Sequence, residues 1–469
     1  MIAPQRMPMP KLNRRHVLGA GLGAGAWLAA GGSRMPVDLV RAQDAVVLRF
    51  WTPGGSPIFC DVHEQIAQDY AAITPGVTFE PIQCGVGEME DFVQVLLAAI
   101  ASGTPPDATI LWDTPVSLGA RGALEPIDEL MAASQYAKAE NWPAGLLSSC
   151  QFKGATYGLP VTAGLYGMWY NVDALDAKGI PSDRASFPKT WDELRAMSKE
   201  FVQIDGDYVA SAGFIPVGWN YPDDVVTLEI WAALNGGTLY DAENQQYTID
   251  SESNIALMQY MVDWLDEQYN GDINMVRSSW WWNGYASEDG LPPAFQAGNQ
   301  AFMQQGSWLM GDYAADTEPE ATNWNIAPYP VGPGGSASVS GYWPNWLVMP
   351  KGSAHPAEMF GYLDYMSAIG VEKWFSAVVD IPVNTEAKQI LPQSVIDSRG
   401  EEFAADIMTF WTDQAAIATR MWDSPTQSFS NDQLTRALER IMTKEATVQD
   451  ALTEAQAASQ AELENVLSE

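Results

Sequence analysis

Short apolar strands alternate with amphipathic helices along the first third of the chain, and this alternation is what most constrains the fold. Residues 46–50 (VVLRF), 77–81 (VTFEP) and 108–111 (ATIL) have the apolar character of buried strands. Between them, apolar residues recur at helical spacing over 62–73 and over 92–100. This order of strands and helices predicts an α/β fold in which mostly parallel sheets are flanked by helices.

A second alternating region begins near Tyr166. Thr190 and Glu193 have the capping-box spacing that precedes a helix. Near the end of the chain, an apolar stripe over 434–442 and an Ala-rich segment from Thr447 predict two more helices. The chain has 469 residues, which exceeds the size at which a single core stops growing, so we expect two or three domains.

The segments that leave the three predicted strands are rich in glycine and polar residues: TPGGSP, CGVGE and WDTP. In open α/β sheets, ligands bind beyond the carboxyl ends of the strands. Gly54 and Gly85, with Gly55 and Gly87 beside them, would let the backbone approach a ligand closely. The alternative is that these glycines only permit sharp turns between a strand and a helix.

Residues 1–42 have the features of an export signal. A basic segment, 10–15 (PKLNRR), precedes an apolar stretch at 17–30 that is too short to span a membrane stably. The adjacent Arg14 and Arg15 resemble a twin-arginine signal, and we expect cleavage at the end of this segment. An ordinary secretory signal and a retained anchor are the alternatives. In each case the protein is exported, to the periplasm or to the cell surface.

The balance of charges excludes one class of partner. The chain has 24 Lys and Arg against 59 Asp and Glu, which gives a formal net charge of -35. A surface this negative repels nucleic-acid phosphates and anionic lipid head groups. We therefore expect no nucleic-acid partner.

Cysteine and histidine are scarce. Three cysteines permit one internal disulfide, and we expect Cys60 to pair with Cys84, because they fall at the start of the first helix and the end of the second strand. Three unpaired thiols, Cys150 included, are the alternative. The spacings match no zinc pattern, and His63 and His355 are the histidines beyond the export signal. We expect no metal site, no cofactor and no catalytic residues of the His-dependent kind.

Tryptophan is unusually frequent. The chain has 19, including Trp280, Trp281 and Trp282 in one run and Trp343 and Trp346 close together. Neighbouring residues point in different directions, so three adjacent rings cannot all be buried on one face. An exposed indole matches the apolar face of a pyranose, and burying about 150 Å² at about 25 cal/mol per Å² gives a few kcal/mol per ring. We therefore expect a carbohydrate ligand, although a core is the commoner place for any single ring.

Five motifs in a fixed order resemble the family 1 extracellular solute-binding proteins of ABC importers. They are ASGTPPDATILW (101–112), YGLPVTAGLYGMWYN (157–171), PKTWDEL (188–194), AFQAGNQAFMQQGSW (294–308) and IPVN (381–384). The resemblance covers nearly the whole chain beyond the export signal, and well-known members of the family bind maltose and other sugars. It implies two α/β lobes joined by a hinge that the chain crosses three times, with the ligand held between the lobes.

The resemblance also implies where each lobe begins and ends. The N-terminal lobe would comprise 43–160 and 327–370, and the C-terminal lobe 161–326 and 371–469. The crossings would fall at the junctions between these ranges.

Positions that meet the sugar in the family are carried over onto this chain residue by residue. They are Trp51, Gly54, Trp112, Asp113, Thr162, Gly164, Trp308, Trp343 and Asn345. Composition and loop position add Gly85, Trp219, Trp280, Trp281 and Trp282. Gly164 stands where an acidic residue is common in sugar-binding members, which implies a different or larger sugar, or weaker polar coordination.

The function implied is that of a monomeric receptor that binds a sugar and delivers it to the permease subunits of an ABC importer. Two alternatives are open. An exported glycoside hydrolase also combines tryptophans with carboxylates, and needs two carboxyls about 5–9 Å apart. A receptor for an anionic solute such as glycerol phosphate would need cations in its site, for which Arg277 is the candidate.

Overall fold

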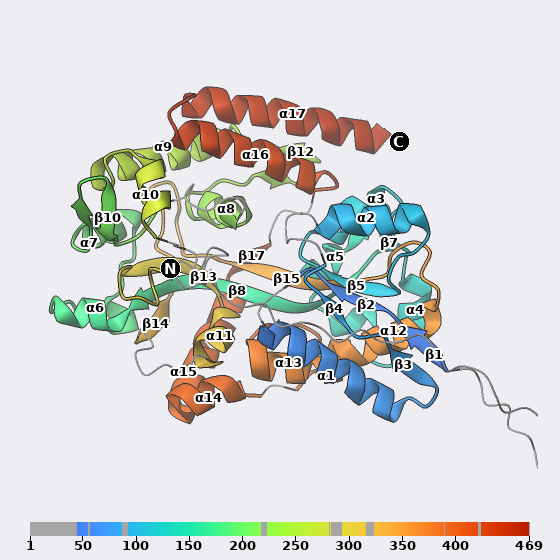
Figure 1. The fold of residues 1–469 in the computed structure, drawn as a ribbon. Coiled ribbons are helices and arrows are strands. Elements are labelled where there is room, and N and C mark those ends of the chain that lie inside the picture. The colour runs from blue at the N-terminus through green and yellow to red at the C-terminus, as the bar shows by residue number, and fades with distance from the viewer. Residues whose placement is uncertain are drawn as a thin grey trace, which may run out of the picture. The chain divides into compact units, whose positions relative to one another are not determined.

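The computed structural model of the protein describes residues 45–54, 57–86, 92–216, 223–280, 282, 293–315, 323–388, 390–420 and 424–468 (Figure 1). The predicted export signal at 1–42 lies outside these residues, as do Gly55, Gly87, Trp219 and Trp281. Within the described ranges, no helix is both long and apolar enough to cross a membrane.

The first part of the chain folds as the alternation of strands and helices predicts. Its elements are β1 (Val46–Leu48), β2 (Phe50–Thr52), α1 (Pro57–Ile73), β3 (Val77–Phe79), β4 (Gln83–Cys84), α2 (Phe92–Ser102), β5 (Ala108–Leu111), α3 (Pro115–Ala120), α4 (Asp128–Ala133), η1 (Ala139–Asn141), α5 (Ala144–Ser148), β6 (Gln151–Phe152) and β7 (Ala155–Thr156). β1 pairs in parallel with β3, and β2 pairs in parallel with both β4 and β5. The helical spacing over 62–73 is realised in α1, which buries Val62, Ile66 and Tyr70 against this core.

The middle of the chain begins with a long strand. Its elements are β8 (Leu159–Asn171), α6 (Val172–Ala177), η2 (Arg184–Ser186), α7 (Trp191–Lys199), β9 (Gln203–Asp205), β10 (Tyr208–Ser211), α8 (Asp223–Leu234), β11 (Tyr240–Asp241), β12 (Gln246–Tyr247), α9 (Glu252–Gln268), α10 (Ile273–Ser279), β13 (Phe302–Gly306), α11 (Leu309–Ala315) and β14 (Trp324–Ala327). The capping box predicted from Thr190 and Glu193 is present at the start of α7.

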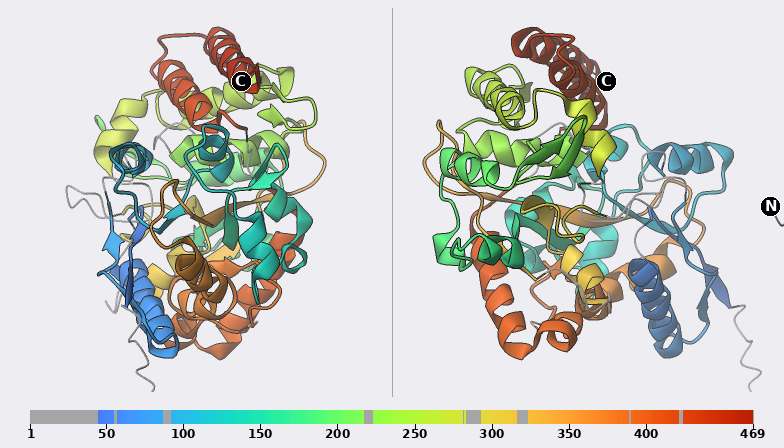
Figure 2. Two further views of the ribbon diagram at one scale, coloured as in Figure 1. Left: turned by 90° about the vertical axis from the view of Figure 1, so that its right-hand side faces the viewer. Right: turned by 60° about the vertical axis from the view of Figure 1, so that its left-hand side comes forward.

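The last part of the chain contains a second long strand and most of the remaining helices. Its elements are β15 (Ser340–Val348), α12 (Pro356–Tyr365), the π-helical turn η3 (Met366–Gly370), α13 (Val371–Val378), β16 (Ile381–Pro382), α14 (Gln393–Arg399), α15 (Glu401–Ala416), β17 (Ala418–Arg420), α16 (Gln427–Met442) and α17 (Val448–Ser468). The two helices predicted near the end of the chain are α16 and α17, which pack side by side in every view (Figure 2).

One nine-stranded sheet contains both long strands. Its strands follow the order β13-β8-β15-β5-β2-β4, with β14 and β16 also paired to β8, and β17 to β15. Parallel pairing, as predicted, joins β4, β2 and β5. The sheet as a whole is mixed, however, because β8 pairs antiparallel with β13, β14, β15 and β16, and β15 pairs antiparallel with β5. The chain runs out along β8 and returns along β15, which forces this antiparallel contact.

Separate apolar clusters cover the faces of this sheet. Val161, near the start of β8, belongs to a cluster formed with α1, α12 and α13. Further along β8, Met168 packs with α8, α9 and α16, whereas its neighbour Trp169 packs with α11, α14 and α15 on the other face. Figure 1 shows these two groups of helices on opposite sides of β8. Another cluster joins α2 and α3 to β5, through Leu96 and Leu111.

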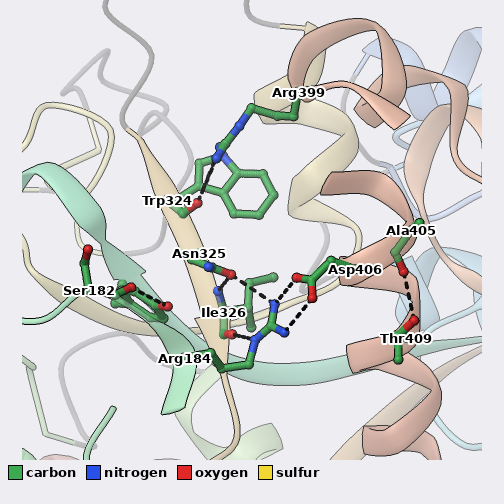
Figure 3. A network of polar contacts seen from close by, with 10 residues as sticks. Ser182, Arg184, Trp324, Asn325, Ile326, Arg399, Ala405, Asp406 and Thr409 are labelled. Atoms are coloured by element: carbon green, nitrogen blue, oxygen red, sulfur yellow. Dashed lines mark hydrogen bonds and ion pairs between the residues drawn. The ribbon is translucent and has the colours of Figure 1, made fainter. Parts of the chain in front are cut away.

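Two arginines hold β14, which pairs only with β8 among the described strands (Figure 3). Arg184 donates from Nε to the carbonyl oxygen of Ile326 (2.7 Å) and forms an ion pair with Asp406 of α15 (2.7 Å). Arg399 of α14 stacks over the ring of Trp324, 5.1 Å from its centroid, and donates to the Trp324 carbonyl oxygen (3.3 Å). These bonds satisfy carbonyl groups along β14 and attach the strand to α14 and α15.

Candidate ligand-binding site

Trp308 lies between β13 and α11, where three apolar clusters meet. Its half-buried ring rests on backbone, because a Cβ built at Gly164 of β8 or at Gly306 of β13 would overlap the indole. Tyr166 packs edge-on against the ring, with centroids 5.1 Å apart and planes at 86°. The missing side chain at Gly164 therefore makes room for Trp308. From the sequence, Gly164 is interpreted only as the loss of an acidic side chain. The structure adds a steric reason for glycine here, because a side chain would overlap Trp308.

Trp112 follows β5 and is half-buried. Its Nε1 donates to Oδ1 of Asn345 at 2.8 Å, and its ring lies edge-on to Phe59, with centroids 6.1 Å apart. Asn345 in turn donates from Nδ2 to Oγ1 of Thr162 (2.8 Å). Three of the positions implied by the resemblance are thus joined by hydrogen bonds at the carboxyl end of β5.

Trp343 and Trp51 lie on strands next to these residues. Trp343 of β15 is half-buried and pairs with Gly164 of β8, the glycine under Trp308. Its ring lies edge-on to that of Trp346, with ring centroids 6.2 Å apart. Trp51 of β2 is half-buried against the α2 cluster. The strand pairings therefore bring the positions of Trp308, Trp343 and Trp112 to one region of the sheet.

Asp113 is the acidic group of this region. It is partly buried, directly after Trp112. Burial raises the pKa of its carboxyl to about 6, and the negative charge of Asp432 on α16 adds to the rise. Asp432 lies on α16, which packs on the Met168 side of β8. Asp113 can accept hydrogen bonds from hydroxyl groups when it is ionised.

A disulfide fixes the two glycine turns that leave β2 and β4. Cys60 of α1 is joined to Cys84 of β4, with Cα atoms 5.8 Å apart. Gly54 and Gly85 both have positive φ, and a Cβ built at Gly54 would lie 3.5 Å from the Cα of Gly85. Both glycines therefore have the backbone conformation that a sharp turn requires. Cys150 is buried elsewhere, in the α2 cluster.

Comparison with known proteins adds to this geometry. The profile of the family described as bacterial extracellular solute-binding protein matches residues 64–372, well over half of the chain. The chain belongs to this family.

Relatives of this solute-binding protein match it over different lengths. The chain spans about a third (33%) of the length of a Brucella abortus relative that is 29% identical over 149 residues, 31% of this chain. An arabinooligosaccharide-binding protein of Halalkalibacterium halodurans is 24% identical over 339 residues, which are 69% of this chain and 67% of that protein.

Among solved structures, the solute-binding protein resembles CpMnBP1 with mannotriose bound. The TM-score is 0.72 at 22% identity, over 88% of this chain and 100% of the other. This likeness shows the fold, which is the two-lobe α/β fold of periplasmic binding proteins.

Part of the tryptophan run is not available to a ligand of the solute-binding protein. Trp282 is 1% exposed and donates from Nε1 to the carbonyl oxygen of Val276 (2.8 Å). It is a core residue, which corrects its prediction as a ligand-binding ring. Trp280, at the end of α10, is half-buried beside Tyr208, with centroids 6.3 Å apart. Both rings contact the same apolar cluster, and Trp281 between them lies outside the described residues.

The cationic residue that could bind an anionic solute already forms an ion pair within the solute-binding protein. Arg277 of α10 forms an ion pair with Glu439 of α16 at 2.9 Å. A phosphate would have to compete with this carboxylate. In the part of the chain that the structure describes, no group of three or more His, Cys, Asp or Glu side chains is arranged to hold a metal ion.

Several residues of this region carried no signal in the sequence of the solute-binding protein. Tyr166 and Gly306 pack on Trp308, and Asp380 accepts a hydrogen bond from Asn345 (3.3 Å). Asp380 immediately precedes the IPVN motif, and Tyr166 and Gly306 lie within two of the other motifs, which do not show what these residues contact.

Proposed function

We propose that this chain is the extracytoplasmic receptor of an ABC importer, and that it binds a neutral sugar or oligosaccharide between its two lobes. The observation that carries the proposal is the position of Trp308, a half-buried indole held flat against the glycines of β8 and β13 where three apolar clusters meet. The proposal is that the exposed part of this ring stacks on a pyranose. Family membership supports the same role.

The proposed site combines aromatic faces with a few polar groups, as sugar sites require. Trp112 and Trp343 are further half-buried rings of the region, and Asp113 supplies a carboxylate for hydroxyl groups. Trp51 lies on β2, and Gly54 and Gly85 lie in the turns that follow β2 and β4. Thr162 is buried, and contributes through Asn345.

The lobes are proposed to comprise 43–160 with 327–370, and 161–326 with 371–469. A ligand that touches both lobes stabilises only the closed form. A shift from 1:99 to 99:1 in favour of closure requires a preference of about 5.5 kcal/mol for the closed form, which two or three stacked rings and charge-assisted hydrogen bonds supply. The closed monomer would then dock on the permease outside the cytoplasm, and a partner subunit would hydrolyse ATP.

A ligand screen tests the proposal. Purified protein without residues 1–42 is heated with mannotriose, arabinotriose, maltotriose or glycerol 3-phosphate, and a bound ligand raises the melting temperature. We expect an oligosaccharide to raise it and glycerol 3-phosphate to have no effect. Trp308→Ala should weaken binding of that oligosaccharide at least fivefold, by about 1 kcal/mol. Tyr260→Ala, which removes a partly buried aromatic ring that packs on Trp191, is the matched control and should retain affinity.

A hydrolase is the second candidate because burial, with the negative charge of Asp432, raises the pKa of the Asp113 carboxyl. Glycosidases use one such acid beside a second carboxylate. Chromatography of each oligosaccharide after prolonged incubation decides between the two functions. Intact sugar supports the receptor, and shortened products would assign the site to a hydrolase.

A further inference from the structure

The side chain of Asn345 uses both of its N–H donors and its amide oxygen in hydrogen bonds to protein groups. It is 5% exposed on β15. Its Oδ1 accepts from Nε1 of Trp112 (2.8 Å), and its Nδ2 donates to Oγ1 of Thr162 (2.8 Å) and to Oδ2 of Asp380 (3.3 Å). A side-chain amide has two N–H donors, and both are used here. Asn345 therefore has no donor left for a ligand, contrary to the expectation that it meets the sugar.

The strand register explains why these partners meet. β15 pairs with β5 through Trp346 and Leu111, which places Asn345 beside Trp112 across the same pair of strands. On its other side Asn345 pairs with Thr162, and a β-bulge follows at once, because Trp346 pairs with Pro160. Such bulges redirect side chains. The extra residue is Val161 of β8, so the pairing changes directly beyond the pair formed by Asn345 and Thr162.

The same hydrogen bonds bring together three segments that are far apart in the sequence. Thr162 lies on β8, Asn345 on β15, and Asp380 just before β16. Pro382 of β16 also pairs with Thr162, so β8 lies between β15 and β16 at this point. Asp380 accepts a further hydrogen bond from Nε1 of Trp374 in α13 (3.0 Å). Thr162 directly follows the proposed crossing between residues 160 and 161.

Trp112 is oriented by this arrangement. Its one N–H is taken by Asn345, so the indole can offer a ligand only its ring faces. Phe59 packs edge-on to the ring. A hydrogen bond at one end of the indole and an aromatic contact along its side leave it little freedom to rotate.

We infer that Asn345 is a positioning residue, which sets the plane of Trp112 and ties it to the segments at 162 and 380, without itself contacting the ligand. The effect on sugar affinity rests on the proposed function, whereas the effect on Trp112 does not. When Asn345 is removed, Trp112 loses its hydrogen-bond acceptor and the three segments lose a shared contact, so the ring can turn away from a stacking orientation.

The indole ¹H–¹⁵N signals of the unliganded protein test the positioning directly. Trp112→Phe and Trp231→Phe identify the two signals by their loss. Asn345→Ala should shift the Trp112 signal and leave that of Trp231 in place. The matched control is Gln304→Ala, because Gln304 accepts from Nε1 of Trp231 (2.6 Å) and donates to Thr227 (2.9 Å) in the same manner. That variant should shift only the Trp231 signal. An unmoved Trp112 signal in folded Asn345→Ala would overturn the inference.

Asn345→Asp is a second variant for the same measurement. An aspartate keeps an acceptor for Trp112 but loses both donors, so the Trp112 signal should stay closer to that of the wild type than in Asn345→Ala. If both variants shift it equally, the hydrogen bond to Trp112 does not set the ring position.

A double-mutant cycle with the oligosaccharide found in the screen separates positioning from direct contact. Asn345→Ala should weaken binding about fivefold to tenfold in the wild-type background, the loss expected for one hydrogen bond. It should have little further effect in the Trp112→Phe background, where the bond is already absent. Equal losses in both backgrounds would mean that Asn345 contacts the sugar. If mannotriose, arabinotriose and maltotriose all fail to bind, the proposed function fails, while the indole signals still decide the role of Asn345.

Discussion

The indole of Trp308 lies directly against Gly164, so closely that a Cβ on Gly164 would overlap Cζ3 and Cε3 of the ring. Gly306 bounds the same ring from β13, and the carbonyl oxygen of Trp343 lies 3.3 Å from the position of that Cβ. A glycine on each of two neighbouring strands thus creates the flat surface on which the ring lies. The position of Trp308 depends on the absence of two side chains.

Gly164→Ala should therefore displace Trp308 and weaken binding of the oligosaccharide by about tenfold. The added methyl group would overlap the indole, and the repacking costs about 1 to 3 kcal/mol. Isothermal titration calorimetry measures the loss. In a Trp308→Ala background, where the ring is gone, the same substitution should cost little. A loss of the same size there would show that Gly164 acts on the ligand independently of Trp308.

Local signals in the sequence predicted much of the fold. Thr190 and Glu193 specify the start of α7 by a hydrogen-bonding pattern that spans three residues, and the structure contains that capping box. The strands at 46–50, 77–81 and 108–111 were identifiable because buried parallel strands are short apolar runs. Each of these predictions needs only a few neighbouring residues.

Contacts between distant residues could not be predicted in the same way. Trp112 and Asn345 are 233 residues apart, and Asn345 and Thr162 are 183 apart. Their hydrogen bonds arise from the antiparallel pairing of β15 with β5 and β8, which periodicity does not reveal. The burial of Trp282 could not be predicted for a similar reason. Its burial depends on how α10 packs, and composition shows only that three adjacent rings cannot share a face.

The disulfide should contribute to stability. Cys60 and Cys84 are separated by 24 positions, and closing a loop of that size stabilises a fold by about 3 kcal/mol. We expect reductant to lower the urea midpoint of the wild type and to have no effect on a Cys60→Ser, Cys84→Ser variant. Cys150→Ala is the control and should stay sensitive to reductant. A wild type with the same midpoint in both conditions would contradict this prediction.

His63 should make the fold sensitive to acid. It is buried among Phe50, Phe59 and Trp374, and burial lowers the pKa of its imidazole from 6.5 to about 4, despite the bond between Nδ1 and the carbonyl oxygen of Phe59 (2.7 Å). The folded protein therefore binds the proton less tightly than the unfolded chain. The stability from this group is complete above pH 6.5 and is lost as the pH falls toward 4, by about 3 kcal/mol in total.

Urea unfolding at a series of pH values measures this loss. His63→Gln removes the titrating group, so its stability should fall less steeply between pH 6.5 and pH 4 than that of the wild type. Parallel curves for the two proteins over that interval would exclude His63 as the source of acid sensitivity.

Asp113 should make the folded protein less stable as the pH rises, whereas His63 makes it less stable as the pH falls. Burial, with the charge of Asp432, raises the pKa of its carboxyl from 3.8 to about 6, so the folded protein holds the proton more tightly than the unfolded chain. The resulting stability is present at low pH and is lost as the pH rises from about 4 to about 6. Asp113→Asn should therefore melt at a higher temperature than the wild type at pH 8, and the difference should disappear near pH 4. Asp432→Asn should raise the melting temperature at pH 8 by less, because burial is the larger cause.

Asp113→Asn should weaken ligand binding, although it stabilises the unliganded protein. In the proposed site the ionised carboxylate would accept two hydrogen bonds from sugar hydroxyls, whereas an amide has only one oxygen acceptor. We expect Asp113→Asn to bind the oligosaccharide about tenfold more weakly at pH 8, where the wild type is ionised, although the unliganded variant is the more stable protein. Calorimetry and thermal melting of the same two proteins measure both effects. If Asp113→Asn gains stability and keeps full affinity, the Asp113 carboxylate does not bind the sugar and Asp113 does not belong to the proposed site.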